Sequence, residues 1–95
     1  MKVRYSNLAR RDLFNILYQG ELNFGRVKAK AYSDKLEKAV KRFGIYPEIA
    51  RLRSEMKPPV RIFPVGSHVI IYQIADGVCV IIRILHGHQN LEDHL

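Results

Sequence analysis

The 95-residue sequence has one cysteine, no long apolar run and only isolated glycines. A single cysteine, Cys79, cannot form an internal disulfide, which excludes a secreted disulfide scaffold. No stretch reaches the ~18 consecutive apolar residues of a membrane-spanning helix. The first seven residues lack the apolar core of a secretory signal. Since the glycines are scattered, no phosphate-binding Gly-rich loop is present. We therefore expect a small cytoplasmic protein without membrane association.

Basic residues are scarce in the last third of the chain and concentrated in the first two thirds. Residues 1–61 contain 15 of the 16 Lys and Arg residues against six acids, a net charge of +9, whereas residues 62–95 carry −2. A basic segment suits an acidic protein, a nucleic acid or a ribosome as partner. Solvated helix faces that only confer solubility explain the same charges. The length allows one domain, spanning residues 1–95, with one modest core.

Hydrophobic periodicity predicts a short strand over residues 2–5, followed by two helices. Ser6 and Asn7 offer side-chain caps for the first helix, whose apolar stripe begins at Ala9 and which is expected to end between Gly20 and Asn23. A turn around Gly25 leads into a second helix over about 26–43. Two amphipathic helices joined by so short a turn predict an antiparallel helical hairpin.

The last third of the chain changes to strand patterns. Residues 45–59 contain three prolines and are expected to be an irregular connector. Strands are predicted over 60–65, 68–74 and 78–86, with a tight hairpin at Asp76-Gly77. The last strand is apolar on both faces, as expected of a central strand. The predicted fold is α+β in the order β-α-α-β-β-β, with the helical hairpin packed on one face of a small, mainly antiparallel sheet. The other face must be covered by another segment or bind a partner.

Several residue types point to possible chemistry, and most favour structural roles. Cys79 lies mid-strand, so we expect a buried, inert thiol. His86 and His88 form an i, i+2 pair near three further potential ligands, but the spacing matches no closed zinc pattern. We therefore expect no metal and no cofactor. The three further ligands considered are Glu92, Asp93 and His94.

Arg83 is the only basic residue after Arg61, and it lies inside an apolar strand. A charge there must be paired or solvated. Spacing favours a structural ion pair, for which the candidate acids are Asp12, Glu37 and Glu48. The alternative is an anion-facing arginine that, with His86 and Arg61, stabilises a phosphoryl transition state without a metal.

A second apolar row, Phe14, Tyr18 and Leu22, lies at i, i+4 and i+8 of the first helix. The row either packs against the connector or contacts a partner. A groove between helices and sheet with basic rims suits an amphipathic, acidic segment, which would dock as a helix or add a strand.

Several short motifs follow one another along the chain in a characteristic order and spacing. The most specific motif is Ile82-Arg83-Ile84-Leu85-His86-Gly87, at the last strand. The other motifs are Ser6, Ala9 and Asp12-Leu13 in the first helix, Ala31-Tyr32 and Leu36 in the second, Pro47 and Arg51 in the connector, Arg61, and His68-Val69-Ile70-Ile71-Tyr72. Together they resemble, from end to end of the chain, the RelE/ParE toxin superfamily, and more closely its ParE branch.

The resemblance implies a toxin of a bacterial type II toxin–antitoxin system, masked by a cognate ParD-like antitoxin in a hetero-oligomer. ParE-like proteins are regarded as inhibitors of DNA gyrase that do not hydrolyse RNA. We expect Phe14, Tyr18 and Leu22 to bind antitoxin. The residues expected to bind the target are Arg61, Arg83, His86 and His88.

Two alternatives remain open from the sequence. A RelE-like protein would be an enzyme, a metal-independent, ribosome-dependent mRNA endonuclease. In that case His86 would serve as general acid or base, and Arg61 and Arg83 would hold phosphate. The other alternative is an inactive homologue that still binds antitoxin. Direct nucleic-acid binding stays undecided.

Overall fold

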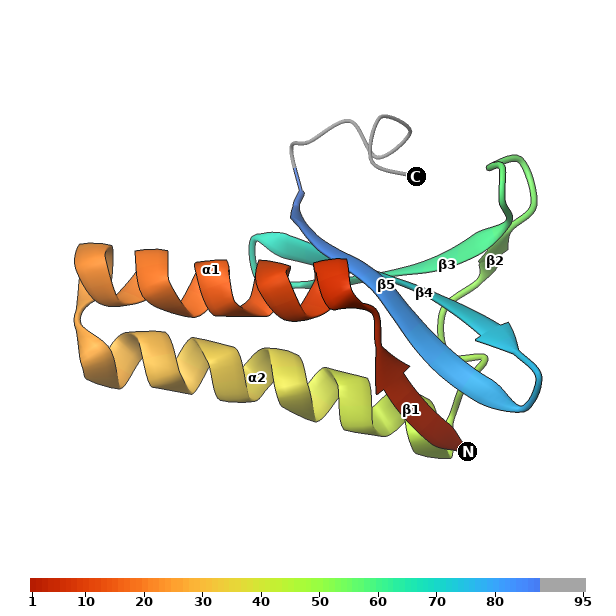
Figure 1. Ribbon diagram of the computed structural model, residues 1–95, viewed down its shortest axis with the longest axis horizontal. Helices are drawn as coiled ribbons and strands as arrows, with labels where there is room; N and C mark the ends of the chain where they lie inside the picture. The colour runs from red at the N-terminus through yellow and green to blue at the C-terminus, as the bar shows by residue number, and fades with distance from the viewer. Residues whose placement is uncertain (88–95) are drawn as a thin grey trace.

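The computed structural model of the chain describes residues 1–87 and shows two helices packed on one face of a five-stranded sheet (Figure 1). The sheet order is β1-β5-β4-β3-β2, and among its pairs only β1 and β5 run parallel. The predicted α+β fold is confirmed, with one addition, because β2 lies in the connector that was expected to be irregular. The elements are β1 (Lys2–Tyr5), α1 (Asn7–Phe24), α2 (Arg26–Ile45), β2 (Leu52–Arg53), β3 (Val60–Val65), β4 (His68–Ala75) and β5 (Val78–His86).

Both helices are longer than the periodicity predicts. Helix α1 passes through Gly20 and ends at Phe24, one residue beyond the expected range, where its cap Gly25 has a φ of 84°. A Cβ on Gly20 would lie 3.2 Å from the Cβ of Ala29 in α2, so the missing side chain lets the two helices approach closely. Within residues 1–87, neither helix combines the length and apolar character needed to cross a membrane.

The N-terminus of α1 is bonded to the sheet by Ser6. The Ser6 hydroxyl oxygen accepts a hydrogen bond from Ala9 N at 3.0 Å, as a helix cap does. The same hydroxyl donates to the carbonyl of Ile82 in β5 at 2.7 Å, and Ser6 N donates to Ile81 O at 2.8 Å. The predicted cap is therefore confirmed, and it also positions the start of α1 against the central strand.

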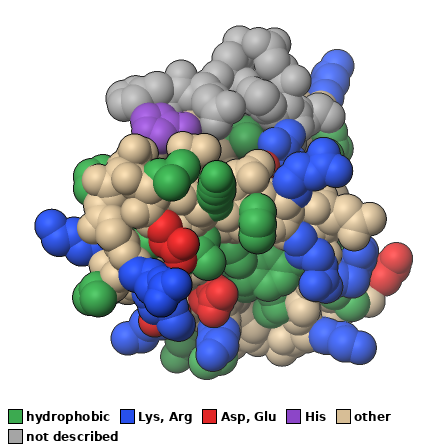
Figure 2. All heavy atoms as spheres, turned by 60° about the vertical axis from the view of Figure 1, so that its left-hand side comes forward, with side chains coloured by type: hydrophobic (Ala, Val, Ile, Leu, Met, Phe, Trp, Pro, Cys, Tyr) green, Lys and Arg blue, Asp and Glu red, His purple; other side chains and the backbone are tan. Residues whose placement is uncertain are grey.

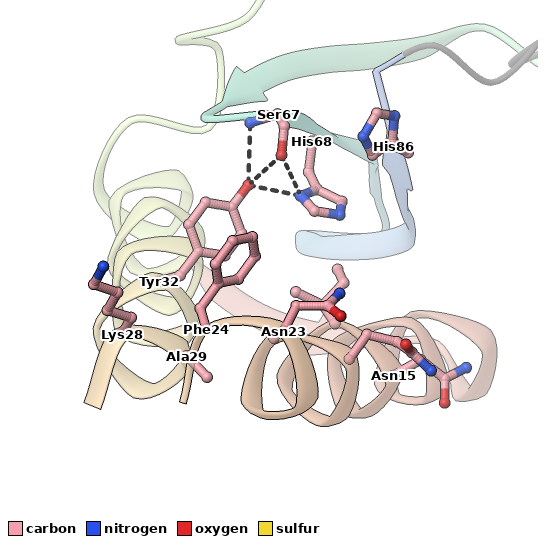
Figure 3. Close-up of a pocket in the computed structure, with 12 residues that line it drawn as sticks. Asn15, Asn23, Phe24, Lys28, Ala29, Tyr32, Ser67, His68 and His86 are labelled. Atoms are coloured by element: carbon pink, nitrogen blue, oxygen red, sulfur yellow. Dashed lines mark hydrogen bonds between the residues drawn. The ribbon is translucent and has the colours of Figure 1, made fainter. Parts of the chain in front are cut away.

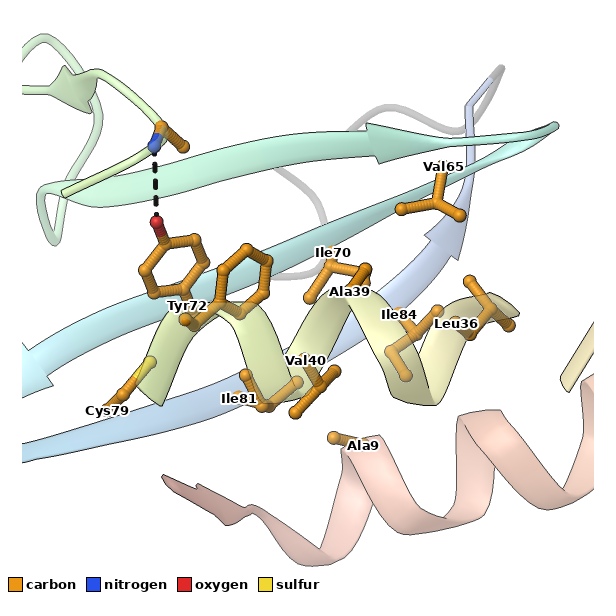
Figure 4. Packing of buried hydrophobic residues seen from close by; sticks show 12 residues of the cluster. Ala9, Leu36, Ala39, Val40, Val65, Ile70, Tyr72, Cys79, Ile81 and Ile84 are labelled. Carbon is orange, nitrogen blue, oxygen red and sulfur yellow. Dashed lines mark hydrogen bonds between the residues drawn. The ribbon is translucent and has the colours of Figure 1, made fainter. Parts of the chain in front are cut away.

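The main core lies between the helices and the sheet (Figure 4). Phe43 of α2 stacks on Tyr72 of β4, with ring centroids 4.1 Å apart, and meets Phe63 edge-on at 5.4 Å. The buried Tyr72 hydroxyl donates to Pro47 O at 2.8 Å and accepts from Ala50 N at 3.3 Å. Burying this aromatic cluster supplies much of the core's apolar area, and the two hydrogen bonds hold the connector against it.

A second, smaller cluster covers the opposite face of the sheet. Val60, Ile71 and Leu85 are buried there, and Met56 of the connector packs against them. Of the two alternatives given for this face, cover by another segment is observed for part of it. The covering segment is the stretch of connector between β2 and β3.

The β4–β5 hairpin combines a tight turn with a bulge. Asp76 and Gly77 have φ values of 53° and 74°, as the predicted turn requires. Closer to the other end, Tyr72 faces Ile81 whereas Ile71 faces Arg83, so β5 carries one extra residue. A bulge of this kind shifts the register of everything beyond it by one residue.

Cys79 is fully buried between Val78 and Val80, as the sequence predicts. Burial raises the pKa of its thiol to about 11. At pH 8 this pKa leaves a thiolate fraction about 100-fold smaller than that of an exposed thiol. We expect iodoacetamide to modify the native protein at least 100-fold more slowly than the guanidinium-unfolded protein, measured by mass spectrometry. Equal rates in the two states would contradict this burial.

Candidate functional site

A pocket of about 600 Å³ opens between the helical hairpin and one end of the sheet (Figure 3). Its floor is mainly apolar, with Ile16 and Gly20 from α1 and Ala29 from α2. Phe24, at the turn between the helices, and Lys28 also line it. The remaining lining residues are Asn15, Gln19, Asn23, Tyr32, Ser67, His68 and His86.

Tyr32 of α2 connects the helical hairpin to the β3–β4 turn. Its hydroxyl accepts the backbone N–H of Ser67 at 3.1 Å and lies 2.6 Å from Nδ1 of His68 and 3.3 Å from the carbonyl oxygen of Val65. Gly66 makes this contact possible, because a Cβ there would come within 2.7 Å of the Tyr32 ring. The single hydroxyl proton has three possible acceptors, His68 Nδ1, Val65 O and, at 3.3 Å, Ser67 Oγ, so the tautomer of His68 is coupled to the direction of this bond.

His68 and His86 lie directly opposite each other on β4 and β5. Their rings meet edge to face, with centroids 5.4 Å apart. Desolvation and the neighbouring His86 lower the pKa of His68 below its usual value. A lowered pKa keeps this imidazole neutral at neutral pH, so the pocket presents a neutral, hydrogen-bonded histidine beside a second, exposed one.

Arg83 is held in an ion pair with Asp12 of α1. Its Nε and Nη2 donate to the two carboxylate oxygens at 2.8 and 2.9 Å, and Ile84 N donates to the same carboxylate at 2.9 Å. The bonds to Asp12 raise the pKa of the guanidinium. Of the three acids proposed from the sequence, Asp12 is the partner. Strand β1 ends at Tyr5, which pairs with Ile81 of β5. Beyond that point the Asp12 carboxylate accepts the Ile84 N–H bond that a longer neighbouring strand would accept.

Arg61 lies in a different part of the sheet. It faces Tyr72 across the β3–β4 pair, and its Nη1 donates to Ala50 O at 2.6 Å. Tyr72 is four residues along β4 from His68, a separation of about 13 Å. Arg61 therefore lines a separate hollow, shared with Leu52 and Gln73.

The structure thus separates the residues that the sequence grouped. His86 lines the pocket, Arg83 is engaged by Asp12, and Arg61 lines another hollow. The fourth predicted target-binding residue, His88, lies outside the described residues, as do Glu92, Asp93 and His94. Within residues 1–87, no three His, Cys, Asp or Glu side chains gather as a metal-binding group.

The second apolar row of α1 is on the surface. Phe14, Tyr18 and Leu22 are 67%, 47% and 66% exposed, and the rings of Phe14 and Tyr18 stack at 6.4 Å. These exposures show that the connector does not cover the row. Exposed Arg11 lies one turn before Phe14. Figure 2 views the molecule from the side of the hairpin, where hydrophobic side chains reach the surface among Lys and Arg side chains.

Sequence reasoning missed the roles of Tyr32, Ser67 and His68. Tyr32 and His68 entered only as parts of family-like motifs. Counting pairs from the Asp76-Gly77 turn would place His68 opposite Leu85, since the bulge that moves it opposite His86 leaves no mark in the hydrophobic pattern. One signal in the sequence could have paired them: His68 begins one predicted strand and His86 ends the next, so an antiparallel hairpin brings the two histidines close together.

Comparison with known proteins places the chain in a family. A family model described as "ParE toxin of type II toxin-antitoxin system, parDE" matches residues 3–91. Toxin ParE3 of Caulobacter vibrioides is 33% identical over 73 residues, which cover 77% of this chain and 73% of that protein. Toxin ParE1 of the same organism is 31% identical over 93 residues, which cover 97% of this chain and 95% of that protein.

A solved structure agrees with the fold. The structure described as "Chromosomal ParDE TA system from P. aeruginosa" matches with a TM-score of 0.79 and 21% identity, covering 90% of this chain and 95% of that one. Its β-strands and helices therefore have the same arrangement as those described above. Since the family model covers nearly the whole chain and two curated toxins exceed 30% identity, this chain belongs to the ParE toxin family of type II toxin–antitoxin systems.

Proposed function

We propose that this ParE-family toxin is neutralised by an acidic, ParD-like antitoxin and inhibits DNA gyrase by binding to it in the bacterial cytoplasm. The antitoxin and the toxin would form a hetero-oligomer. The observation that carries the antitoxin part is the row of Phe14, Tyr18 and Leu22, which is exposed on a protein of formal net charge +7. An exposed apolar row among basic side chains suits an amphipathic acidic segment.

The placement of the charged residues supports binding rather than RNA cleavage. A metal-free nuclease needs cationic groups and a general acid or base around one phosphate. Here Arg83 is neutralised by Asp12, and Arg61 faces a position about 13 Å along β4 from the histidine pair. We therefore assign Arg61 and His86 to target binding, and we assign Arg83 to holding β5 against α1.

The test is inducible expression of the chain without its antitoxin. DNA and protein synthesis are followed by incorporation of labelled thymidine and methionine, and mRNA integrity by primer extension. We expect DNA synthesis to stop first, with intact mRNA, and purified gyrase to lose supercoiling activity when the purified chain is added. Arrested translation with cleaved mRNA would replace this proposal with the nuclease function.

Co-expression of the antitoxin provides the control for the same experiment. Growth should recover when the proposed acidic, ParD-like antitoxin is expressed with the toxin. Absence of any growth effect from the toxin alone, together with retained antitoxin binding, would identify an inactive antitoxin-binding homologue instead.

A further inference from the structure

We propose that one flank of helix α2 binds the phosphate backbone of double-stranded DNA. The contact is made by four exposed basic side chains, Lys28, Lys35, Lys38 and Arg42, called here the α2 basic stripe. The inference goes beyond the proposed binding of antitoxin and gyrase, because it concerns DNA itself and its DNA-binding test contains neither protein.

Helix geometry places the four cations in one row. At about 100° per residue their positions fall within roughly 80° of the helix circumference, and Lys28 and Arg42 lie about 21 Å apart along the axis. Each strand of a DNA duplex carries one phosphate per ~3.4 Å of axis, so the row is as long as about six base pairs. Four cations spread over that length can therefore contact several phosphates of the backbone at once.

Contacts at the two ends of the α2 basic stripe show which way it faces. The guanidinium carbon of Arg42 lies 6.0 Å from the ring centroid of Phe63 in β3. Lys28 lines the pocket together with Ser67 of the β3–β4 turn. Figure 3 shows Lys28 on the side of α2 that is turned away from Asn15 of α1. The stripe therefore follows the flank of α2 on the side of β3, which α1 does not cover.

The two acids of α2 are engaged outside the α2 basic stripe. Asp34 binds Lys30 at 2.9 Å. Glu37 lines a hollow beside β1, together with Tyr5 and Lys41. Within residues 1–87, none of the four stripe side chains forms an ion pair. Their charges are therefore not neutralised by the protein itself, and they would release counterions from DNA when they contact its phosphates.

The composition of the α2 basic stripe favours a double helix over a protein or a single strand. Protein–protein interfaces are depleted in Lys and enriched in aromatic residues, whereas three of the four stripe residues are Lys. Proteins that bind single strands present aromatic side chains on which the bases stack. The large hydrophobic side chains exposed on α2 are Val27 and Ile45, at its two ends, and neither is aromatic. Contacts of this kind read the charge of the backbone and not the base sequence.

The experiment measures binding of a fluorescein-labelled DNA duplex of about 20 base pairs to the full-length chain, by fluorescence anisotropy at several salt concentrations. Four phosphate contacts predict that the affinity falls about 150-fold between about 50 and 200 mM NaCl. The double variant Lys35→Gln and Lys38→Gln keeps two contacts, so its affinity should fall only about 12-fold over the same range. At the lower salt concentration this variant should bind at least 10-fold more weakly than the parent.

The double variant Lys30→Gln and Lys41→Gln is the matched control, because it removes two exposed lysines of the same helix from outside the stripe and changes the net charge equally. It should bind the duplex within a few-fold of the parent and keep the parent's salt dependence. Equal losses in the two double variants would reduce the effect to overall charge and overturn the proposal.

Three other outcomes would also overturn it. If the parent does not bind the duplex at the lower salt concentration, the α2 basic stripe is only a solvated helix face. If the Lys35→Gln and Lys38→Gln variant loses affinity for the purified antitoxin but binds DNA as the parent does, the stripe is a protein-binding surface. If an RNA duplex of the same sequence binds at least 10-fold more tightly than the DNA, the assignment to DNA is wrong.

Discussion

Replacing Asp12 with alanine is expected to lower the free energy of unfolding by about 2–4 kcal/mol. The change removes the acceptor of two guanidinium bonds and of the Ile84 amide, all between 2.8 and 2.9 Å. The side chains of Arg83 and Asp12 are only 17% and 13% exposed, so water cannot fully replace these bonds. For a domain of this size the loss corresponds to a fall in Tm of about 10–25 °C, measured by circular dichroism.

Two comparisons make the Asp12 measurement specific. Asp12→Asn retains an acceptor for Ile84 N and loses the charge, so its effect should be intermediate. Asp34→Ala breaks the 2.9 Å bond between Lys30 and Asp34, whose side chains are 73% and 57% exposed, and should leave Tm unchanged. If Asp12→Ala proved as mild as Asp34→Ala, the ion pair would not have the structural role assigned to it.

The double substitution Phe14→Asp and Leu22→Asp is expected to weaken antitoxin binding at least 100-fold. Each change puts a charge into the centre of the proposed apolar contact, and loss of a central contact of this kind typically costs about 2 kcal/mol or more. Stability should be retained, because the two side chains are 67% and 66% exposed. Affinity for the purified antitoxin is measured by calorimetry, and neutralisation by growth on co-expression.

Ile45→Asp is the matched control for the apolar row. Ile45 is 70% exposed at the C-terminal end of α2, so the substitution introduces one carboxylate on a similarly exposed side chain outside the row and is compared with Leu22→Asp alone as well as with the double variant. It should leave antitoxin affinity within a few-fold of the parent. Equal losses from the control and the double variant would indicate a general charge effect, and an unchanged affinity in the double variant would place the antitoxin elsewhere.

Local patterns along the chain were sufficient to predict most elements. The cap at Ser6, the turn at Asp76-Gly77 and the periodicities of the helices and strands depend on near neighbours, and these predictions are confirmed. Errors occurred where a distant contact decided the outcome. Gly20 would weaken an isolated helix, but the missing Cβ lets α1 lie close to Ala29 of α2, and α1 continues to Phe24. Strand β2 is two residues long and exists because β3 offers it an edge.

The candidate site was predictable only in part. Helix geometry predicted Phe14, Tyr18 and Leu22 as a second apolar row, and only the structure shows that the connector leaves this row exposed. The need for an acidic partner near Arg83 also followed from the sequence. The separation of Arg61 from His86 did not, because it depends on which strands lie between them and in what register.

The sequence by itself determined the hairpin of helices, the strands other than β2, the uneven charge and the apolar row of α1, because each depends on residues close together in the chain. Only the tertiary structure decided that Asp12 pairs with Arg83 and that His68 faces His86. The physical reason is the same in both cases. A short parallel strand leaves the edge of β5 open to a helix carboxylate, and one extra residue in β5 changes which side chains meet across the sheet.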